Sequence, residues 1–333
     1  MNRRNAFRYI ALLIVAAAVV WLIVQWLPPG HVPDYPPQFQ ADLGVWVGIE
    51  WAMEPKSASD IEQLVSDLLS QGVTDAFFYV SYLKQDGTFN PTYDHAAEFV
   101  RQFSTAAPTI RAWGWVGVPI QGEIDGEAVE NRLENAEIRR VVADFGGTIV
   151  ENLGFYGLHL DAEMAASDDP YYVDTLDLIR SALPADGKLS VATHALRVTE
   201  AVTSIPYPAQ AHHWTPAYLS TVANATDQVV VMVYDSGLFT PADYRNWTAY
   251  QVRSTVDTLS AVDTHVLVGL PISEEWTPSH HPYAENLSNG LLGLRIGLSQ
   301  VSLPARLDGI ALYPHWELSE EEWALVEHMT RAD

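Results

Sequence analysis

The sequence predicts an α/β protein of the (β/α)₈ TIM barrel class, preceded by a single amino-terminal transmembrane helix. Eight apolar, β-rich segments alternate with amphipathic segments along most of the 333 residues, and 48% of the residues are hydrophobic. Near-continuous apolar strands separated by helices are typical of a parallel sheet covered by helices. Eight such units in one chain of this length favour a barrel over a doubly wound sheet.

The expected barrel strands are Leu43–Ile49, Asp75–Val80, Ile110–Val118, Tyr156–Asp161, Leu189–Thr193, Val229–Tyr234, Val266–Leu270 and Leu307–Tyr313. The expected helices are Ser59–Ser70, Tyr93–Phe103, Ala128–Asn152, Tyr171–Leu183, Pro216–Val222, Ala242–Ala261, Tyr283–Val301 and Glu320–Met329. The unit after the fifth strand is the least regular. The chain shows no internal repeat and no linker that would indicate a second domain.

The first 41 residues predict a membrane attachment. Residues 1–8 form a basic tip containing Arg3, Arg4 and Arg8, and residues 9–27 carry no charge. Such a run can cross a bilayer as a signal anchor with its arginines in the cytoplasm, which would place the remaining domain outside the cytoplasm. A cleaved signal peptide is the alternative, but no small-residue cleavage site precedes Pro28. Residues 28–41 are proline-rich and indicate a stiff spacer before a domain at 42–333.

The composition limits the possible partners. The formal net charge is −24 at pH 7, and cysteine is absent. An acidic surface repels nucleic acid and suits a neutral or cationic partner, although it can also serve solubility alone. Without cysteine, thiol catalysis and cysteine-bound metals are excluded. We expect no cofactor and no metal, because the pairs His212-His213 and His280-His281 lack the spacing that brings two imidazoles to one ion.

The stretch from Gly154 to Glu163, GFYGLHLDAE, has the period-two pattern of a strand with two faces. Asp161 and Glu163 share one face at the end of this strand, where barrel enzymes carry their catalytic groups. Two adjacent carboxylates resist ionising together, so one of them should hold a proton and could act as a general acid. Carboxylates that merely cap a helix or face solvent would give the same short pattern.

Aromatic residues are concentrated where the predicted strands end. Sugar rings pack on aromatic faces, so a barrel mouth lined in this way suits a glycan, although tryptophan and tyrosine also fill barrel cores. The group comprises Trp46, Trp51, Tyr79, Tyr82, Trp113, Trp115, Trp214, Tyr234, Trp276, Tyr313 and Trp316.

These motifs resemble the family 18 glycoside hydrolases, the group of chitinases and endo-β-N-acetylglucosaminidases. That family carries DxxDxDxE on strand four, of which Asp161 and Glu163 are kept, while His159 replaces the inner aspartate and Tyr156 or a neighbour replaces the outer one. Its strand-six Met-x-Tyr-Asp matches the run from Met232 to Asp235. Its Gly-x-Pro on strand seven matches Gly269-Leu270-Pro271, and Tyr313 replaces the tryptophan at the end of strand eight.

The resemblance implies hydrolysis of polysaccharides or oligosaccharides that contain N-acetylglucosamine, with retention and with the substrate's own acetamido group as nucleophile. Glu163 would be the general acid, and Asp161 would hold the acetamide and stabilise developing charge. Tyr234 would orient the acetamide carbonyl, and Asp235 would bind a hydroxyl or tune the carboxylate pair. The remaining expected substrate-binding residues are His159, Met232, Trp46, Trp115, Trp276, Tyr313 and Trp316. His159 could share a proton with Asp161 or could be a core histidine.

Two alternatives remain open. A retaining glycosidase with two protein carboxylates would pair Glu163 with Glu274 or Glu275, which follow the seventh strand. A barrel that has lost its reaction would survive as a glycan-binding module, and the replaced aspartates favour that interpretation. An assay of hydrolysis would distinguish binding from catalysis.

Overall fold

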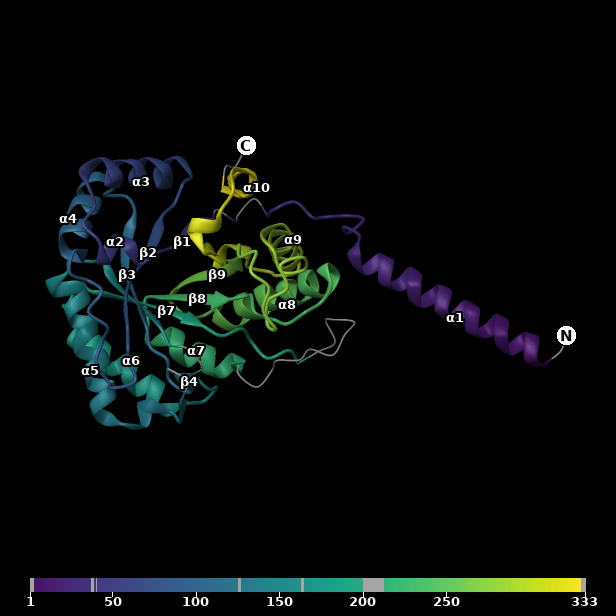
Figure 1. Cartoon of the computed structure of the whole chain (residues 1–333), viewed down its shortest axis with the longest axis horizontal. Coiled ribbons are helices and arrows are strands. Elements are labelled where there is room, and N and C mark those ends of the chain that lie inside the picture. The colour runs from purple at the N-terminus through teal and green to yellow at the C-terminus, as the bar shows by residue number, and fades with distance from the viewer. Residues whose placement is uncertain are drawn as a thin grey trace.

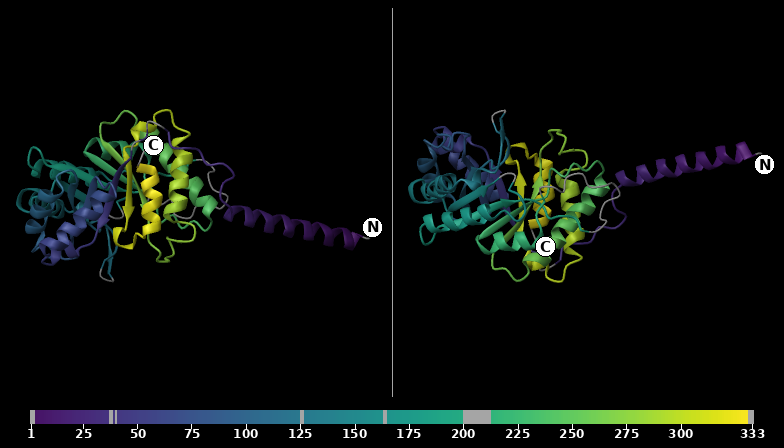
Figure 2. Two further views of the ribbon diagram at one scale, coloured as in Figure 1. Left: turned by 90° about the horizontal axis from the view of Figure 1, so that it is seen from above. Right: turned by 90° about the horizontal axis from the view of Figure 1, so that it is seen from below.

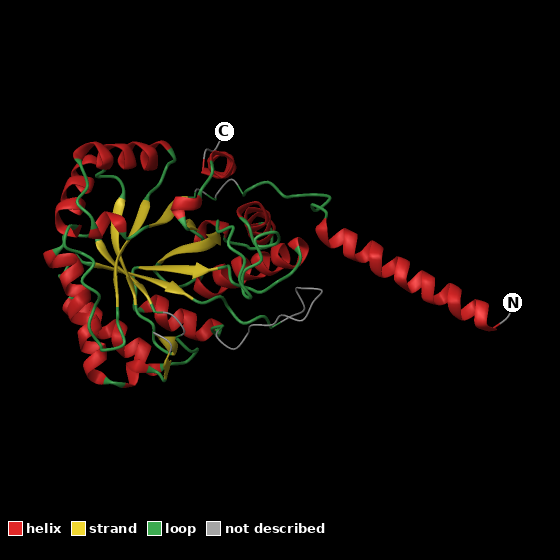
Figure 3. Cartoon of the chain, in the orientation of Figure 1, coloured by secondary structure: helices red, strands yellow, loops and turns green. Residues whose placement is uncertain are grey.

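The computed structural model describes residues 3–36, 39, 41–124, 127–162, 165–199 and 213–330 (Figure 1). Its centre is a closed barrel of eight parallel strands in the order β1-β10-β9-β8-β7-β6-β3-β2. The barrel closes where β1 pairs with β10, in a register that joins Asp42 to Gly309 and Val45 to Leu312. Helices surround these strands, as Figure 3 shows. The predicted barrel class is therefore confirmed.

All eight predicted strands are present, and none of their ends is shifted by more than two residues. The barrel strands are β1 (Asp42–Val47), β2 (Asp75–Tyr82), β3 (Arg111–Gly117), β6 (Gly157–Asp161), β7 (Lys188–Thr193), β8 (Gln228–Met232), β9 (His265–Pro271) and β10 (Gly309–Tyr313). β8 ends at Met232, so Tyr234 lies in the following loop rather than in the strand.

Most predicted helices are also present. The helices are α1 (Arg3–Trp26), α2 (Glu50–Met53), α3 (Ala58–Ser70), α4 (Ala96–Ala106), α5 (Ala136–Gly147), α6 (Pro170–Ala182), α7 (Pro216–Asn224), α8 (Pro241–Leu259), α9 (Leu287–Leu298) and α10 (Glu320–Thr330). The prediction of one helix over 128–152 is wrong at its start. A small hairpin, β4 (Gly122–Ile124) with β5 (Glu127–Val129), and the 3₁₀ turn η1 (Arg132–Glu134) precede α5, and the π-helical turn η2 (Thr148–Asn152) follows it.

Short 3₁₀ turns flank the last strand. η3 (Pro304–Arg306) precedes β10, and η4 (His315–Glu317) follows it. η4 carries Trp316 at the carboxyl end of the barrel.

The strands have the two faces that the period-two pattern predicts. Leu158 and Leu160 of β6 point outward into the large core between barrel and helices. A second cluster fills the barrel itself and consists of Trp46, Phe77, Trp113, Trp115, Val230, Leu267 and Ala311. The interior is thus packed with side chains, and an open site must lie beyond this core, at an end of the barrel.

The amino-terminal helix corrects one prediction. α1 projects away from the barrel in all three views (Figures 1 and 2). Its first turns contain Arg3, Arg4 and Arg8, so only the later part of the helix is apolar. Within the part of the chain that the structure describes, no helix combines the length and the apolar character that crossing a membrane requires. This finding contradicts the predicted membrane-spanning anchor and the single-pass localisation inferred from it.

The segment that follows α1 is tied to the barrel's outer helices. Arg245 of α8 donates from Nη2 to the carbonyl oxygen of Leu27 over 2.8 Å. Arg295 of α9 donates from Nε to the carbonyl oxygen of Pro33 over 2.6 Å and also lies 3.5 Å from the Asp34 carboxylate. These bonds hold the described part of the proline-rich segment against α8 and α9. The boundaries proposed for the segments of the chain remain predictions.

Candidate active site

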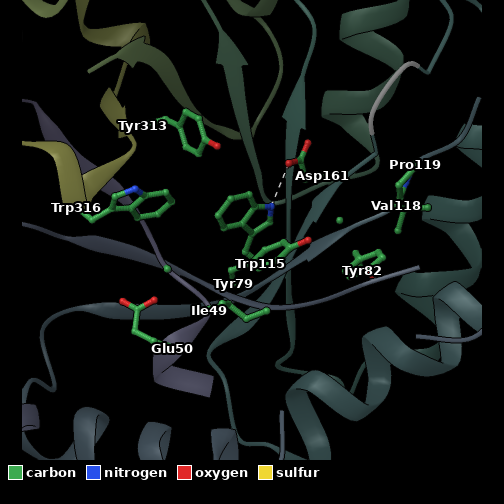
Figure 4. Close-up of a pocket in the computed structure, with 12 residues that line it drawn as sticks. Ile49, Glu50, Tyr79, Tyr82, Trp115, Val118, Pro119, Asp161, Tyr313 and Trp316 are labelled. Atoms are coloured by element: carbon green, nitrogen blue, oxygen red, sulfur yellow. Dashed lines mark hydrogen bonds between the residues drawn. The ribbon is translucent and has the colours of Figure 1, made fainter. Parts of the chain in front are cut away.

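Asp161 is the last residue of β6 and points into the barrel mouth. Its backbone continues the alternation in which Leu158 and Leu160 face outward, so His159 and Asp161 face inward. The indole of Trp115 on β3 donates from Nε1 to Asp161 Oδ2 over 3.1 Å (Figure 4). The carboxylate is largely buried, and the indole therefore fixes the position of one of its oxygens.

A cavity of about 910 Å³ lies over Asp161, within the size range of small-molecule sites. Its described lining residues are Gly48, Ile49, Glu50, Tyr79, Tyr82, Trp115, Gly117, Val118, Pro119, Asp161, Tyr313 and Trp316. These residues come from the carboxyl ends of β1, β2, β3, β6 and β10 and from the segments that follow. The cavity thus lies at the end of the barrel where active sites of this fold are built.

Tyr313 is the centre of the aromatic wall. Its ring lies 6.1 Å from Trp115 and 6.0 Å from Trp316, in both cases edge to face. It also stacks on Tyr234, with centroids 5.9 Å apart and planes 18° apart. Tyr313 thus occupies the wall at the position where the resemblance expected a tryptophan, and Tyr234 contacts it without being among the described lining residues.

His159 is completely buried and belongs to the barrel core. The Trp46 indole donates from Nε1 to His159 Nε2 over 3.1 Å, so Nδ1 carries the proton and donates to Ser190 Oγ over 2.8 Å. Burial lowers the pKa of His159 to about 3, so the imidazole is neutral. The core interpretation of this histidine agrees with its surroundings, because both ring nitrogens are engaged away from Asp161.

The hydrogen bonds of His159 continue toward the opposite end of the barrel. Ser190 Oγ donates to Gln228 Oε1 over 2.6 Å, and Gln228 Nε2 lies 3.4 Å from Asp75 Oδ1. Asp75 is fully buried and accepts from Arg111 Nε and Nη2 over 2.7 and 2.6 Å. None of these bonds involves Asp161, and all of their members lie in the interior of the barrel or at its other end. We therefore interpret the network as a structural feature of the interior.

Some predicted site residues lie away from the cavity lining. Trp46 is 1% exposed and packs under Tyr313, with centroids 5.9 Å apart. Trp276 is 59% exposed on the loop after β9. Met232 ends β8 and is half-buried, without being part of the described lining. Of the predicted binding aromatics, Trp115, Tyr313 and Trp316 are in the wall.

Asp235 follows Tyr234 in the loop after β8, with a φ of 53° in the left-handed region that residues other than glycine rarely adopt. Ser279 Oγ donates to its Oδ1 over 3.4 Å. Partial burial raises the pKa of Asp235, against the opposing effects of the nearby His280 and of the Ser279 bond. Asp235 is exposed and is not among the described lining residues of the cavity.

The loop between β9 and α9 is held by a buried ion pair. His280 Nδ1 lies 3.1 Å from Glu285 Oε2, and His280 Nε2 donates to the Ser273 carbonyl over 2.9 Å. Burial alone would lower the pKa of His280, but the bonds to Glu285 and Ser273 outweigh it and raise the pKa. His281 bonds instead to the Leu238 carbonyl, 3.0 Å away. His280 and His281, which the sequence analysis did not expect to bind a metal together, thus have separate partners. Of the other adjacent pair, His212 lies outside the described residues.

Glu163 also lies outside the described residues, and its predicted role as general acid remains a prediction. Glu274 and Glu275 are exposed on the loop after β9 and are not among the described lining residues. The backbone N–H of Glu274 donates to Glu317. This position gives no support to a partnership across the cavity between either glutamate and Glu163.

The sequence analysis did not predict three of the residues that line the cavity, namely Glu50, Val118 and Pro119. Each of them follows a barrel strand within three residues, Glu50 after β1 and the other two after β3. The available signal was their place at the ends of predicted strands, since Val118 ends one and Glu50 and Pro119 directly follow one, but none of them belongs to a motif or to the aromatic group.

Comparisons with known proteins identify solved structures that have a similar fold. No family model matches the sequence, and no curated protein matches it. The spore cortex-lytic enzyme SleL of Bacillus cereus matches with a TM-score of 0.57 and 11% identity, over 92% of this chain and 76% of SleL. A class V chitinase of Pseudomonas fluorescens matches with a TM-score of 0.58 and 12% identity, over 87% of this chain and 99% of the chitinase.

A family 18 chitinase of Cycas revoluta, solved in complex with (GlcNAc)₄, matches with a TM-score of 0.53 and 13% identity, over 87% of this chain and 99% of the chitinase. At this level of identity the similarity establishes the fold alone. The chain therefore has the barrel fold of family 18 glycoside hydrolases. The resemblance predicted from the strand-four and strand-six motifs is confirmed at that level, and the low identity fits a divergent member.

Proposed function

We propose that this chain is a glycoside hydrolase that acts on glycans containing N-acetylglucosamine. The observation that carries the proposal is Asp161, an inward carboxylate at the end of β6, held by an indole in an aromatic-walled cavity at the barrel mouth. Aromatic faces suit sugar rings, and catalytic groups of this fold occupy the ends of strands. The structural similarity to SleL and to the chitinases supports the same class of substrate.

The proposed reaction is substrate-assisted hydrolysis with retention. Glu163 donates a proton to the glycosidic oxygen while the acetamido oxygen of the substrate attacks the anomeric carbon, and the bond to the leaving sugar breaks. Asp161 accepts the acetamide N–H and stabilises the positive charge of the cyclic intermediate. Water then opens that intermediate, and its proton returns to Glu163. The reaction needs no cofactor.

The two strand-six residues have supporting parts in this proposal. Tyr234 orients the acetamide carbonyl, and its stacking on Tyr313 supports a fixed ring position. Asp235 binds a sugar hydroxyl through a carboxylate that is exposed to solvent.

Hydrolysis of N-acetylglucosamine oligosaccharides by the full chain, beside a Glu163→Gln variant, tests the proposal. The amide keeps the size of the side chain but cannot donate an acidic proton, so turnover should be abolished while glycan binding persists. Wild-type turnover in Glu163→Gln would show that the strand-four assignment is wrong.

A glycan-binding barrel without catalysis is the second candidate. The observation that favours it is His159, which replaces the family's inner aspartate and is neutral, buried and bonded away from Asp161. Binding of the same oligosaccharides without hydrolysis, by wild type and Glu163→Gln alike, would support this function.

A further inference from the structure

Glu50 introduces a second carboxylate to the cavity. It is the first residue of α2, directly after the loop that leaves β1, and it is half-buried. Figure 4 shows Glu50 and Asp161 on opposite sides of Trp115, with Trp316 on the same side as Glu50. The cavity therefore has one carboxylate held by an indole at the proposed reaction centre and another toward its far end.

The local backbone leaves room for the Glu50 carboxylate. Glu50 folds back over Gly48, where a β-carbon would collide with its carboxylate oxygens. Glycine at position 48 thus permits this side-chain position. Across the residues that the structure describes, the Glu50 carboxylate takes part in no hydrogen bond or ion pair, whereas nearby Glu54 binds Lys56 over 2.8 Å. Glu50 is therefore available to a ligand in the cavity.

The charges around the cavity favour a cation. Among its described lining residues, Glu50 and Asp161 are acidic and none is basic. The chain as a whole carries a net charge of −24. A cleft of one sign of charge attracts the opposite charge and disfavours like charge. A sugar that bears a carboxylate would thus be repelled at the Glu50 end, and a sugar that bears an ammonium group would be attracted.

The neighbouring aromatic surface suits a sugar that carries such a cation. Trp316 is 53% exposed and contacts Tyr313 edge to face, so much of its surface remains open. A glucosamine unit has the ring of N-acetylglucosamine but a free amino group at C2. On this wall it would keep the stacking of the acetylated sugar and add an ion pair with Glu50.

We propose that Glu50 is a specificity-determining residue that binds the protonated amine of a glucosamine unit. The preferred substrate is a partly de-N-acetylated glycan, with an N-acetylglucosamine unit over Asp161 and a free glucosamine unit at the Glu50 end. This inference rests on the proposed function, since it assigns the second sugar by its position relative to the first.

Binding of three tetrasaccharides to the full chain tests the inference. One is fully acetylated, and two isomers carry a single glucosamine at either end. At low salt, wild type should bind one isomer about three- to tenfold more tightly than the acetylated tetramer, the range of an ion pair at a partly buried site. Glu50→Gln should bring this ratio close to one. Glu54→Gln, which removes a neighbouring carboxylate outside the cavity lining, should keep the wild-type ratio.

A second variant tests the same point without changing the charge. Gly48→Ala should displace the Glu50 carboxylate and also reduce the ratio, so the inference does not depend on one variant folding. Equal affinity of wild type for all three tetramers, or a preference that survives in a folded Glu50→Gln, would overturn the inference alone. Absence of both binding and turnover with every tetramer would overturn the proposed function, and this inference with it.

Discussion

Replacing Trp115 by phenylalanine removes the indole N–H that donates to Asp161 Oδ2 over 3.1 Å. A hydrogen bond to a charged group contributes about 1.5–3 kcal/mol. If that bond holds Asp161 in its reactive position, kcat should fall about 10- to 150-fold. The phenyl ring retains an aromatic surface in the cavity wall, so KM should change less than kcat.

The same substitution at Trp113 is a matched control. Trp113 lies two residues earlier on the same face of β3, and its indole donates to Asp75 Oδ1 over 2.7 Å, inside the barrel. Trp113→Phe should lower the free energy of unfolding without a comparable loss of kcat.

A double-mutant cycle then identifies the route of the effect. In an Asp161→Asn background, Trp115→Phe should cost much less than it does in wild type, because the carboxylate that the indole positions is already gone. The readout is the oligosaccharide turnover that remains in both backgrounds. An equal loss of kcat in the two backgrounds would refute the positioning role and would leave Trp115 as a stacking surface.

Four further outcomes are expected. A thiazoline mimic of the cyclised intermediate should inhibit hydrolysis, and a lack of inhibition would contradict substrate assistance. Tyr234→Phe should raise the activation free energy of hydrolysis by about 2.7–4 kcal/mol if the hydroxyl acts like an oxyanion-hole donor. Glu274→Gln and Glu275→Gln should both stay near wild-type turnover, and collapse of either would support the two-carboxylate mechanism. Burial lowers the pKa of His159 to about 3, from near 6.5 in the unfolded chain. Between these two pH values the unfolded state binds one more proton than the folded state, so stability falls as the pH is lowered. When the pH is lowered from 6 to 4, the free energy of unfolding should therefore fall more steeply in wild type than in His159→Gln, by up to about 1.4 kcal/mol per pH unit. Denaturant titrations at several pH values measure both slopes, and equal slopes would contradict a buried neutral histidine.

The barrel could be predicted from the sequence because its signal is local and repeated. In β6, alternation alone assigns Leu158 and Leu160 to the outer core and Asp161 to the interior face, and the structure agrees. The hairpin before α5 could not be recognised, because its short strands lie in a stretch whose composition also suits a helix. The membrane anchor was predicted from an uncharged run, and the described helix does not meet the requirements of a membrane span.

The position of a residue along the barrel axis could not be predicted from the sequence. Trp46 faces inward, as its position in β1 predicts, but the strand register sets it beside Phe77, one inward step below Tyr79. It is therefore buried beneath Tyr313 while Tyr79 reaches the cavity. Register depends on pairing between strands that are distant in sequence, so alternation gives the face of a residue but not its layer.

The replacement at position 159 connects the interior of the barrel with the proposed chemistry. A carboxylate at this level would bring charge close to Asp161, whereas the neutral imidazole joins Trp46 to Ser190 within the core. Asp161 is instead held from β3, by the Trp115 indole at the cavity surface. An indole can donate a hydrogen bond but cannot exchange a proton at these pH values. In the absence of the inner carboxylate, the Trp115 indole still orients Asp161, and in the proposed mechanism the proton shared within the motif would come from Glu163.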